Sequence, residues 1–147
     1  MRTTSKFLPN HGFNWLTQSE MDELDITQVP ETSEDGYNLK VDLQYPQELH
    51  DLHSDYPLAP EKMTVTPEML SPYSTTLAED LHLGSASVPK LVPNLSDKKN
   101  YIIHYDNLKL YLSLGLRLTK VHRVLTFKQS AWLEPYLQYP EAYISCQ

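Results

Sequence analysis

The 147-residue sequence is poor in cysteine and glycine. Its one cysteine, Cys146, excludes an internal disulfide framework and a zinc module built on several cysteines. It also favours a reducing, intracellular compartment, with nucleus or cytoplasm left open. Gly12, Gly36, Gly84 and Gly115 are too scattered to form a glycine-rich loop that cradles phosphate. Eighteen apolar residues never occur in a row, so we expect no membrane helix and no membrane partner.

Charge is unevenly distributed along the chain, which is 40% hydrophobic and long enough for one domain at most. Residues 1–87 hold fifteen Asp and Glu against four Lys and Arg, a net charge of −11. Residues 88–147 hold four against eight, a net charge of +4, and the two parts sum to −7. Because basic surfaces concentrate polyanions, this asymmetry favours an anionic partner for the C-terminal part. The alternative is that the two parts neutralise each other in the fold.

The spacing of apolar residues predicts an α+β fold, with a short mixed sheet and several short helices. Residues 7–16 are expected to be irregular, and residues 85–99 to form a linker. Strands are expected at residues 37–45, 101–105 and 116–127. Helices are expected at residues 18–24, 73–83, 107–114 and from Ser130 to about 139, the first with a capping box and the third capped by Asp106 and ended by Gly115.

His50 and His53 have a spacing that could bind a metal if they formed one helical turn. Pro46 and Pro57 bracket a segment too short for a stable helix, and no third ligand follows at a characteristic spacing. A structural or solvated pair of histidines is therefore favoured. The sequence also lacks a Gly-x-Ser-x-Gly element, so it predicts no catalytic nucleophile.

A group of basic residues is the functional site that the sequence favours. If residues 116–127 stay extended, Arg117 and Arg123 share one face of a strand about 20 Å apart and could bridge phosphates. The alternative is an ordinary solvated strand. The candidate nucleic-acid-binding residues are Lys98, Lys99, Arg117, Lys120, Arg123 and Lys128.

Three stretches of the sequence carry a further pattern. They are residues 8–16 (LPNHGFNWL), residues 41–61 with VDLQYP and LHDLHSDYPLAPE, and residues 91–127, which begin with LVPNL. Together they resemble the protein-primed type-B (family B) DNA polymerases of virus-like mobile elements, such as Polinton-type transposons, linear plasmids and phages. The resemblance implies that residues 1–36 are a segment at the edge of the polymerase palm. It implies that residues 37–147 are a palm and priming-protein-insertion fragment, between the first and second polymerase motifs.

The catalytic motifs of that family fall outside these residues: the first would precede Met1 and the second would follow Pro140. A polymerase holds two divalent metals with carboxylates from separate motifs. The resemblance therefore implies Mg2+ for a complete polymerase, but no catalytic residue, metal site or cofactor in this fragment. Asp42 is followed by Tyr45 and Pro46 in a way that superficially resembles the first motif, but the spacing is too short. We expect Asp42 to be a solvated strand carboxylate.

Three interpretations remain open. The chain can be a fragment of a DNA-directed DNA polymerase from a truncated gene, with DNA, a priming protein and the rest of the polymerase as implied partners. It can also be a nonfunctional relic. Alternatively, it is a non-enzymatic adaptor that binds nucleic acid or a protein partner through its basic C-terminal part.

Overall fold

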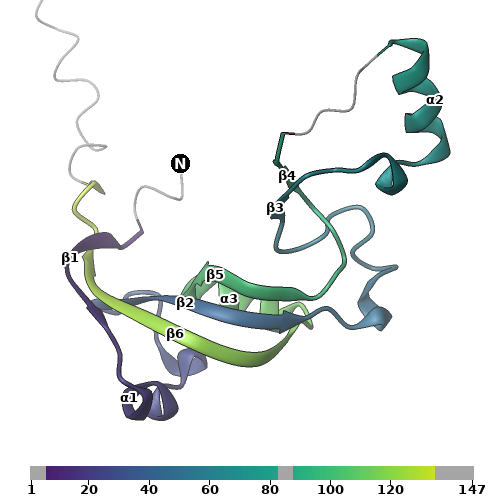
Figure 1. Ribbon diagram of the computed structural model, residues 1–147. Coiled ribbons are helices and arrows are strands. Elements are labelled where there is room, and N and C mark those ends of the chain that lie inside the picture. Colours follow the sequence, from purple (N-terminus) through teal and green to yellow (C-terminus); the bar gives the residue numbers. More distant parts are fainter. Residues whose placement is uncertain (1–5, 83–87, 135–147) are drawn as a thin grey trace, which may run out of the picture. The chain divides into compact units, whose positions relative to one another are not determined.

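A computed structural model describes residues 6–82 and 88–134 (Figure 1). Contacts divide these residues into two compact units, which we describe separately. The first unit comprises residues 6–46 and 97–134, and the second comprises the described residues between 47 and 96.

The first unit is built on a curled, four-stranded sheet with strand order β1-β6-β2-β5 (Figure 1). All neighbouring strands are antiparallel, so the expected α+β fold is confirmed but the expected mixed sheet is wrong. The reason is that β2 lies between β5 and β6, the two strands that α3 joins, so these two are not neighbours. The strands are β1 (Leu8–Trp15), β2 (Asp35–Gln44), β5 (Lys98–His104) and β6 (Arg117–Ser130).

One face of this sheet carries most of the core, while Phe127, opposite Gly36, is buried on the other face. Leu39, Val41 and Leu43 of β2 point to the first of these faces and are almost completely buried. Helix α3 (Tyr105–Ser113) packs on this face against β2 and β5, and it also contacts the 3-10 turn η1 (Ile26–Gln28). We call this the covered face. The even-numbered residues of β2, from Asn38 to Gln44, point to the opposite face, which we call the open face.

Two helices of the first unit lie close to the residues that the local sequence predicted. Helix α1 (Gln18–Glu23) begins with the expected capping box, because the backbone N–H and the hydroxyl of Thr17 donate to Glu20 at 2.8 and 2.7 Å. Helix α3 ends before Gly115, which has the positive φ of 102° typical of a helix stop. Its cap is His104, whose Nδ1 accepts from the Asp106 N–H at 3.4 Å, so the expected Asp106 cap is wrong.

The second unit contains a two-stranded antiparallel sheet of β3 (Glu61–Met63) and β4 (Lys90–Val92). Helix α2 (Pro72–Asp80) is capped by the Ser71 hydroxyl, which accepts from the Ser74 N–H at 3.2 Å. Two 3-10 turns, η2 (Gln47–Leu49) and η3 (Pro67–Met69), complete the regular elements described here.

Three expectations differ from these elements or fall beyond them. Residues 8–15 form strand β1, because β6 provides hydrogen-bonding partners more than a hundred residues away. The expected linker over residues 85–99 contains β4 and the start of β5. Of the helix expected from Ser130 to about residue 139, only residues 130–134 are described. Ser130 is the last residue of β6 and residues 131–133 are not helical, so the expected start is wrong.

Gly36 has no room for a side chain. It lies opposite Phe127 of β6, and a Cβ atom at Gly36 would lie 2.2 Å from Phe127 Cε2 and 2.6 Å from Gln129 Oε1. Phe127 cannot easily withdraw because it is buried, with the rings of Phe13 and His104 at centroid distances of 5.7 and 6.1 Å.

We therefore expect Gly36→Ala to destabilise the protein by about 1–3 kcal/mol, the usual cost of overpacking a well-packed site. Urea unfolding of the variant and of the unchanged protein measures this difference. In a Phe127→Leu background, which removes the clashing ring atoms, the same substitution should cost clearly less. Equal costs in both backgrounds would contradict the packing explanation.

Candidate nucleic-acid interface

Three register shifts of the sheet meet at one residue, Asp42 of β2. In β6, His122 is an extra residue between the pairs Lys40–Arg123 and Val41–Val121, with no residue of β2 directly opposite it. Thr119 is a second extra residue, between the pairs Asp42–Lys120 and Leu43–Leu118. In β5, two residues instead of one lie opposite Asp42. Each extra residue is a β-bulge, which interrupts the regular ladder and leaves backbone groups to be satisfied in other ways.

Asp42 contacts one residue from each of the three bulges. Its carboxylate accepts from the backbone N–H of Asn100 at 2.7 Å and lies 2.8 Å from Nε2 of His122. Its backbone oxygen accepts from the Thr119 hydroxyl at 3.0 Å. Asn100 has a φ of 55°, a left-handed conformation that asparagine tolerates better than most residues. The side chain of Asp42 is 25% exposed, so the carboxylate is partly solvated and is also held by these contacts.

The hydrogen bonds also change the acidity of Asp42. The Asn100 N–H, and next the His122 side chain, stabilise the ionised carboxylate and hold its pKa below the ordinary value. Asp42 therefore stays ionised over the whole neutral range.

The bulges bring three basic side chains of β6 onto the open face. Arg117 lies opposite Gln44, Lys120 opposite Asp42 and Arg123 opposite Lys40. In a regular strand, residues three apart point to opposite faces, so Lys120 would point away from both arginines. The two extra residues, Thr119 and His122, remove that alternation. We call Arg117, Lys120 and Arg123 the cationic row.

The spacing of the cationic row is shorter than the sequence predicted. Each step along the row corresponds to two residues of β2, or about 7 Å. Arg117 and Arg123 are therefore separated by about 14 Å along the strand, rather than the 20 Å of an uninterrupted strand. All three side chains of the row are exposed.

The other predicted basic residues do not join this row. The bulge in β5 places Lys98 opposite Leu43 on the covered face, where it is 1% exposed and interacts within the protein. Lys128 lies opposite Asp35, and its Nζ is 2.6 Å from that carboxylate, which raises the pKa of Lys128. Lys99 is exposed in β5. The structure thus brings together three of the six predicted residues.

Sequence reasoning missed two residues of the open face. Lys40 lies between Arg123 and Ile102 in the sheet, and the alternation of β2 was the signal that could have placed it there. Trp15 of β1 lies opposite Leu125, and Arg123 Cζ is 5.7 Å from the centroid of its ring. No local pattern marked Trp15, because its strand depends on pairing with β6.

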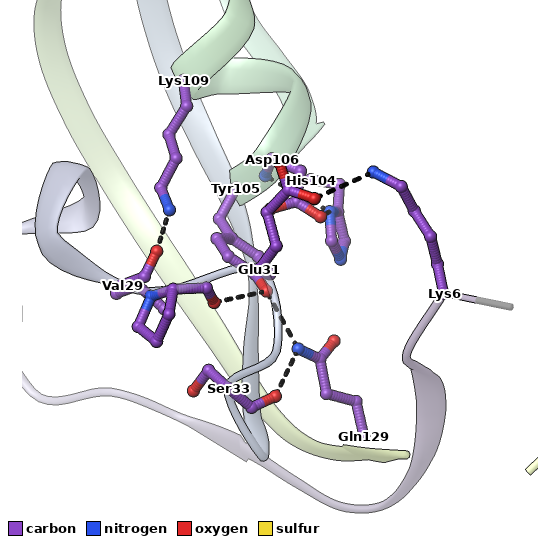
Figure 2. Close-up of polar contacts among 10 residues, drawn as sticks. Lys6, Val29, Glu31, Ser33, His104, Tyr105, Asp106, Lys109 and Gln129 are labelled. Atoms are coloured by element: carbon purple, nitrogen blue, oxygen red, sulfur yellow. Dashed lines mark hydrogen bonds and ion pairs between the residues drawn. The ribbon is translucent and has the colours of Figure 1, made fainter. Parts of the chain in front are cut away.

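A polar network at the β5–α3 junction holds the loop that precedes β2 (Figure 2). Tyr105 donates its hydroxyl to the Pro30 carbonyl at 3.4 Å and accepts from Gln129 Nε2 at 2.9 Å. Gln129 Nε2 also donates to the Ser33 carbonyl at 2.8 Å, and Lys109 donates to the Val29 carbonyl. The side chains of Tyr105, Lys109 and Gln129 therefore hold the loop by donating hydrogen bonds to its backbone carbonyls.

His104, at the edge of this network, is kept neutral by its surroundings. Burial lowers the pKa of His104, although the nearby Asp106 carboxylate opposes that shift. A neutral ring leaves Nδ1 free to accept the Asp106 N–H that caps α3. His104 thus acts as the N-cap of α3.

Within residues 6–82 and 88–134, no group of three or more His, Cys, Asp or Glu side chains is arranged to hold a metal ion. His50 and His53 each interact with other parts of the protein. Among the described helices, none has the length and apolar composition needed to cross a bilayer.

Comparison with known proteins does not assign the chain to a family. No protein-family model matches it, and searches of curated proteins and of solved structures find no significant match.

Replacing Asp42 by asparagine should destabilise the protein, because Asn100 and His122 both contact Oδ1, and a neutral amide oxygen is a weaker acceptor than an ionised carboxylate oxygen. A group with a lowered pKa in the folded state stabilises the protein above its unfolded-state pKa, about 3.9 for aspartate, and this contribution fades as the pH falls through the folded-state pKa. The urea midpoint of Asp42→Asn should therefore lie below that of the unchanged protein at pH 7, and the difference should shrink below about pH 4.

The exposed Asp55 of the second unit offers a matched control. Asp55→Asn should leave the midpoint nearly unchanged at pH 7. A difference for Asp42→Asn that is the same at pH 3 and pH 7 would show that the ionised carboxylate is not what matters.

Proposed function

We propose that the open face of the sheet binds the sugar-phosphate backbone of a nucleic-acid strand, without sequence preference. The observation that carries this proposal is the cationic row, three exposed basic side chains in steps of about 7 Å. Successive phosphates of an extended strand are separated by a similar distance, so each cation can meet one phosphate. Lys40, beside Arg123 on the same face, adds a fourth positive charge.

The negative charge of Asp42 is compatible with this role. Its carboxylate contacts the Asn100 N–H and His122, and Lys120 lies directly opposite it in β6. Contacts to phosphates alone give weak binding, so we expect a Kd of about 10⁻⁴ to 10⁻⁶ M at physiological salt.

We propose further that the chain derives from the palm and insertion of a protein-primed family B DNA polymerase. The motif resemblance of residues 8–16, 41–61 and 91–127 supports this origin. An antiparallel sheet with a helix on one face is compatible with a palm fragment. In this proposal DNA is the nucleic acid, and a priming protein and the rest of the polymerase are the other partners.

The adaptor interpretation is the second candidate, and one observation favours it. The cationic row and Lys40 all belong to the first unit, which has a buried core of its own. All four basic side chains are therefore carried by one unit of this chain.

The binding proposal is tested with a fluorescein-labelled 12-nucleotide oligothymidylate, measured by anisotropy at several salt concentrations. Three or four phosphate contacts predict a slope of log K against log salt of about −2 to −3. The variant Arg117→Ala, Lys120→Ala, Arg123→Ala should bind at least about tenfold more weakly, with a slope near −1 or less steep.

The matched control removes positive charge from the second unit, where Lys62 and Lys90 are exposed. Lys62→Ala, Lys90→Ala should retain the affinity and the slope. If the control and the triple variant lose binding equally, net charge rather than the cationic row accounts for the affinity. If no binding is detected at low salt, the proposal is wrong.

This chain alone should not extend a primer. The proposed origin places both metal-binding motifs of the polymerase outside these 147 residues. A primed template with Mg2+ and nucleotides should therefore give no product above background. Template-dependent incorporation that follows the protein through repeated purification would contradict the proposed fragment.

A further inference from the structure

An exposed aromatic ring lies at one end of the cationic row. Trp15 is 63% exposed, although tryptophan is usually largely buried in folded proteins. The register places it opposite Leu125, on the same face of β6 as Arg123. Ile102, on the far side of Lys40, is 73% exposed and adds apolar surface to the same face.

The ring of Trp15 is positioned next to the cationic row by a contact with Arg123. The guanidinium carbon of Arg123 lies 5.7 Å from the ring centroid, within the range of a cation–π contact. One cation therefore contacts the ring and also ends the line of positive charges. A ligand that uses both needs a flat aromatic group adjacent to an anionic group.

We propose that Trp15 stacks on an unpaired base of a single-stranded nucleic acid whose phosphates lie along the cationic row. This inference rests on the proposed function, and it adds that the ligand is a single strand. In a duplex, the faces of the bases are stacked on one another and only their edges are accessible in the grooves. A single strand can turn a base onto an aromatic side chain, and such stacking tolerates any sequence.

The test uses three fluorescein-labelled 12-mers: oligothymidylate, the same backbone with abasic sites, and a duplex. Anisotropy gives the Kd of each for the unchanged protein and for Trp15→Ala, Trp15→Phe and Tyr73→Ala. Tyr73 is the matched control, because it is 77% exposed but belongs to the second unit. Circular dichroism checks that each variant keeps its fold.

We expect the unchanged protein to bind oligothymidylate about tenfold more tightly than the abasic strand, the effect of stacking one base. Trp15→Ala should abolish that preference and leave binding to the abasic strand unchanged. Trp15→Phe should retain part of the preference, and Tyr73→Ala should retain all of it. The duplex should bind more weakly than oligothymidylate.

A second measurement does not depend on truncating the ring. In a Trp132→Phe background Trp15 is the only tryptophan, and stacking should quench its fluorescence with oligothymidylate but not with the abasic strand. Equal affinities for the two strands, without selective quenching, would overturn the stacking inference while leaving phosphate binding intact. Absence of salt-dependent binding to all three probes would instead remove the proposed function itself.

Discussion

The hydrogen bonds of Asp42 connect three strands at the point where the ladder is most irregular. The carboxylate and backbone oxygen of Asp42 meet groups from Asn100, Thr119 and His122, and each of these lies at a bulge. A bulge leaves polar groups without ladder partners, and buried polar groups need partners if they are not to cost stability. One residue, through its carboxylate and its backbone oxygen, thus contacts a residue of each of the three bulges.

The division of the basic residues between the two faces is a consequence of these bulges. A shift of one residue turns every following side chain to the other face. Two shifts in β6 align Lys120 with Arg117 and Arg123, whereas the single shift in β5 turns Lys98 into the core. Bulges therefore place three basic side chains on the open face and a fourth, Lys98, on the covered face.

The sequence could predict those elements that depend on residues close together in the chain. The alternation of β2, the capping box of Thr17 and Glu20, and the stop at Gly115 are elements of this kind, and all three appear in the structure. The bulges could not be predicted in this way. Asp42 and Asn100 are 58 residues apart, and Asp42 and Thr119 are 77 apart, so the contacts that decide the register have no local signature. The position of Trp15 beside Arg123 could not be predicted for the same reason.

The irregular register also determines how another molecule can approach the sheet. Both edge strands are interrupted, β1 by register shifts around Gly12, with a φ of 72°, and β5 by the bulge at Asn100. A regular, straight edge invites a strand from another chain to continue the ladder, which is a route to aggregation. Neither edge here offers an unbroken row of backbone donors and acceptors. Addition of a strand from another chain is therefore discouraged at both edges of the described sheet.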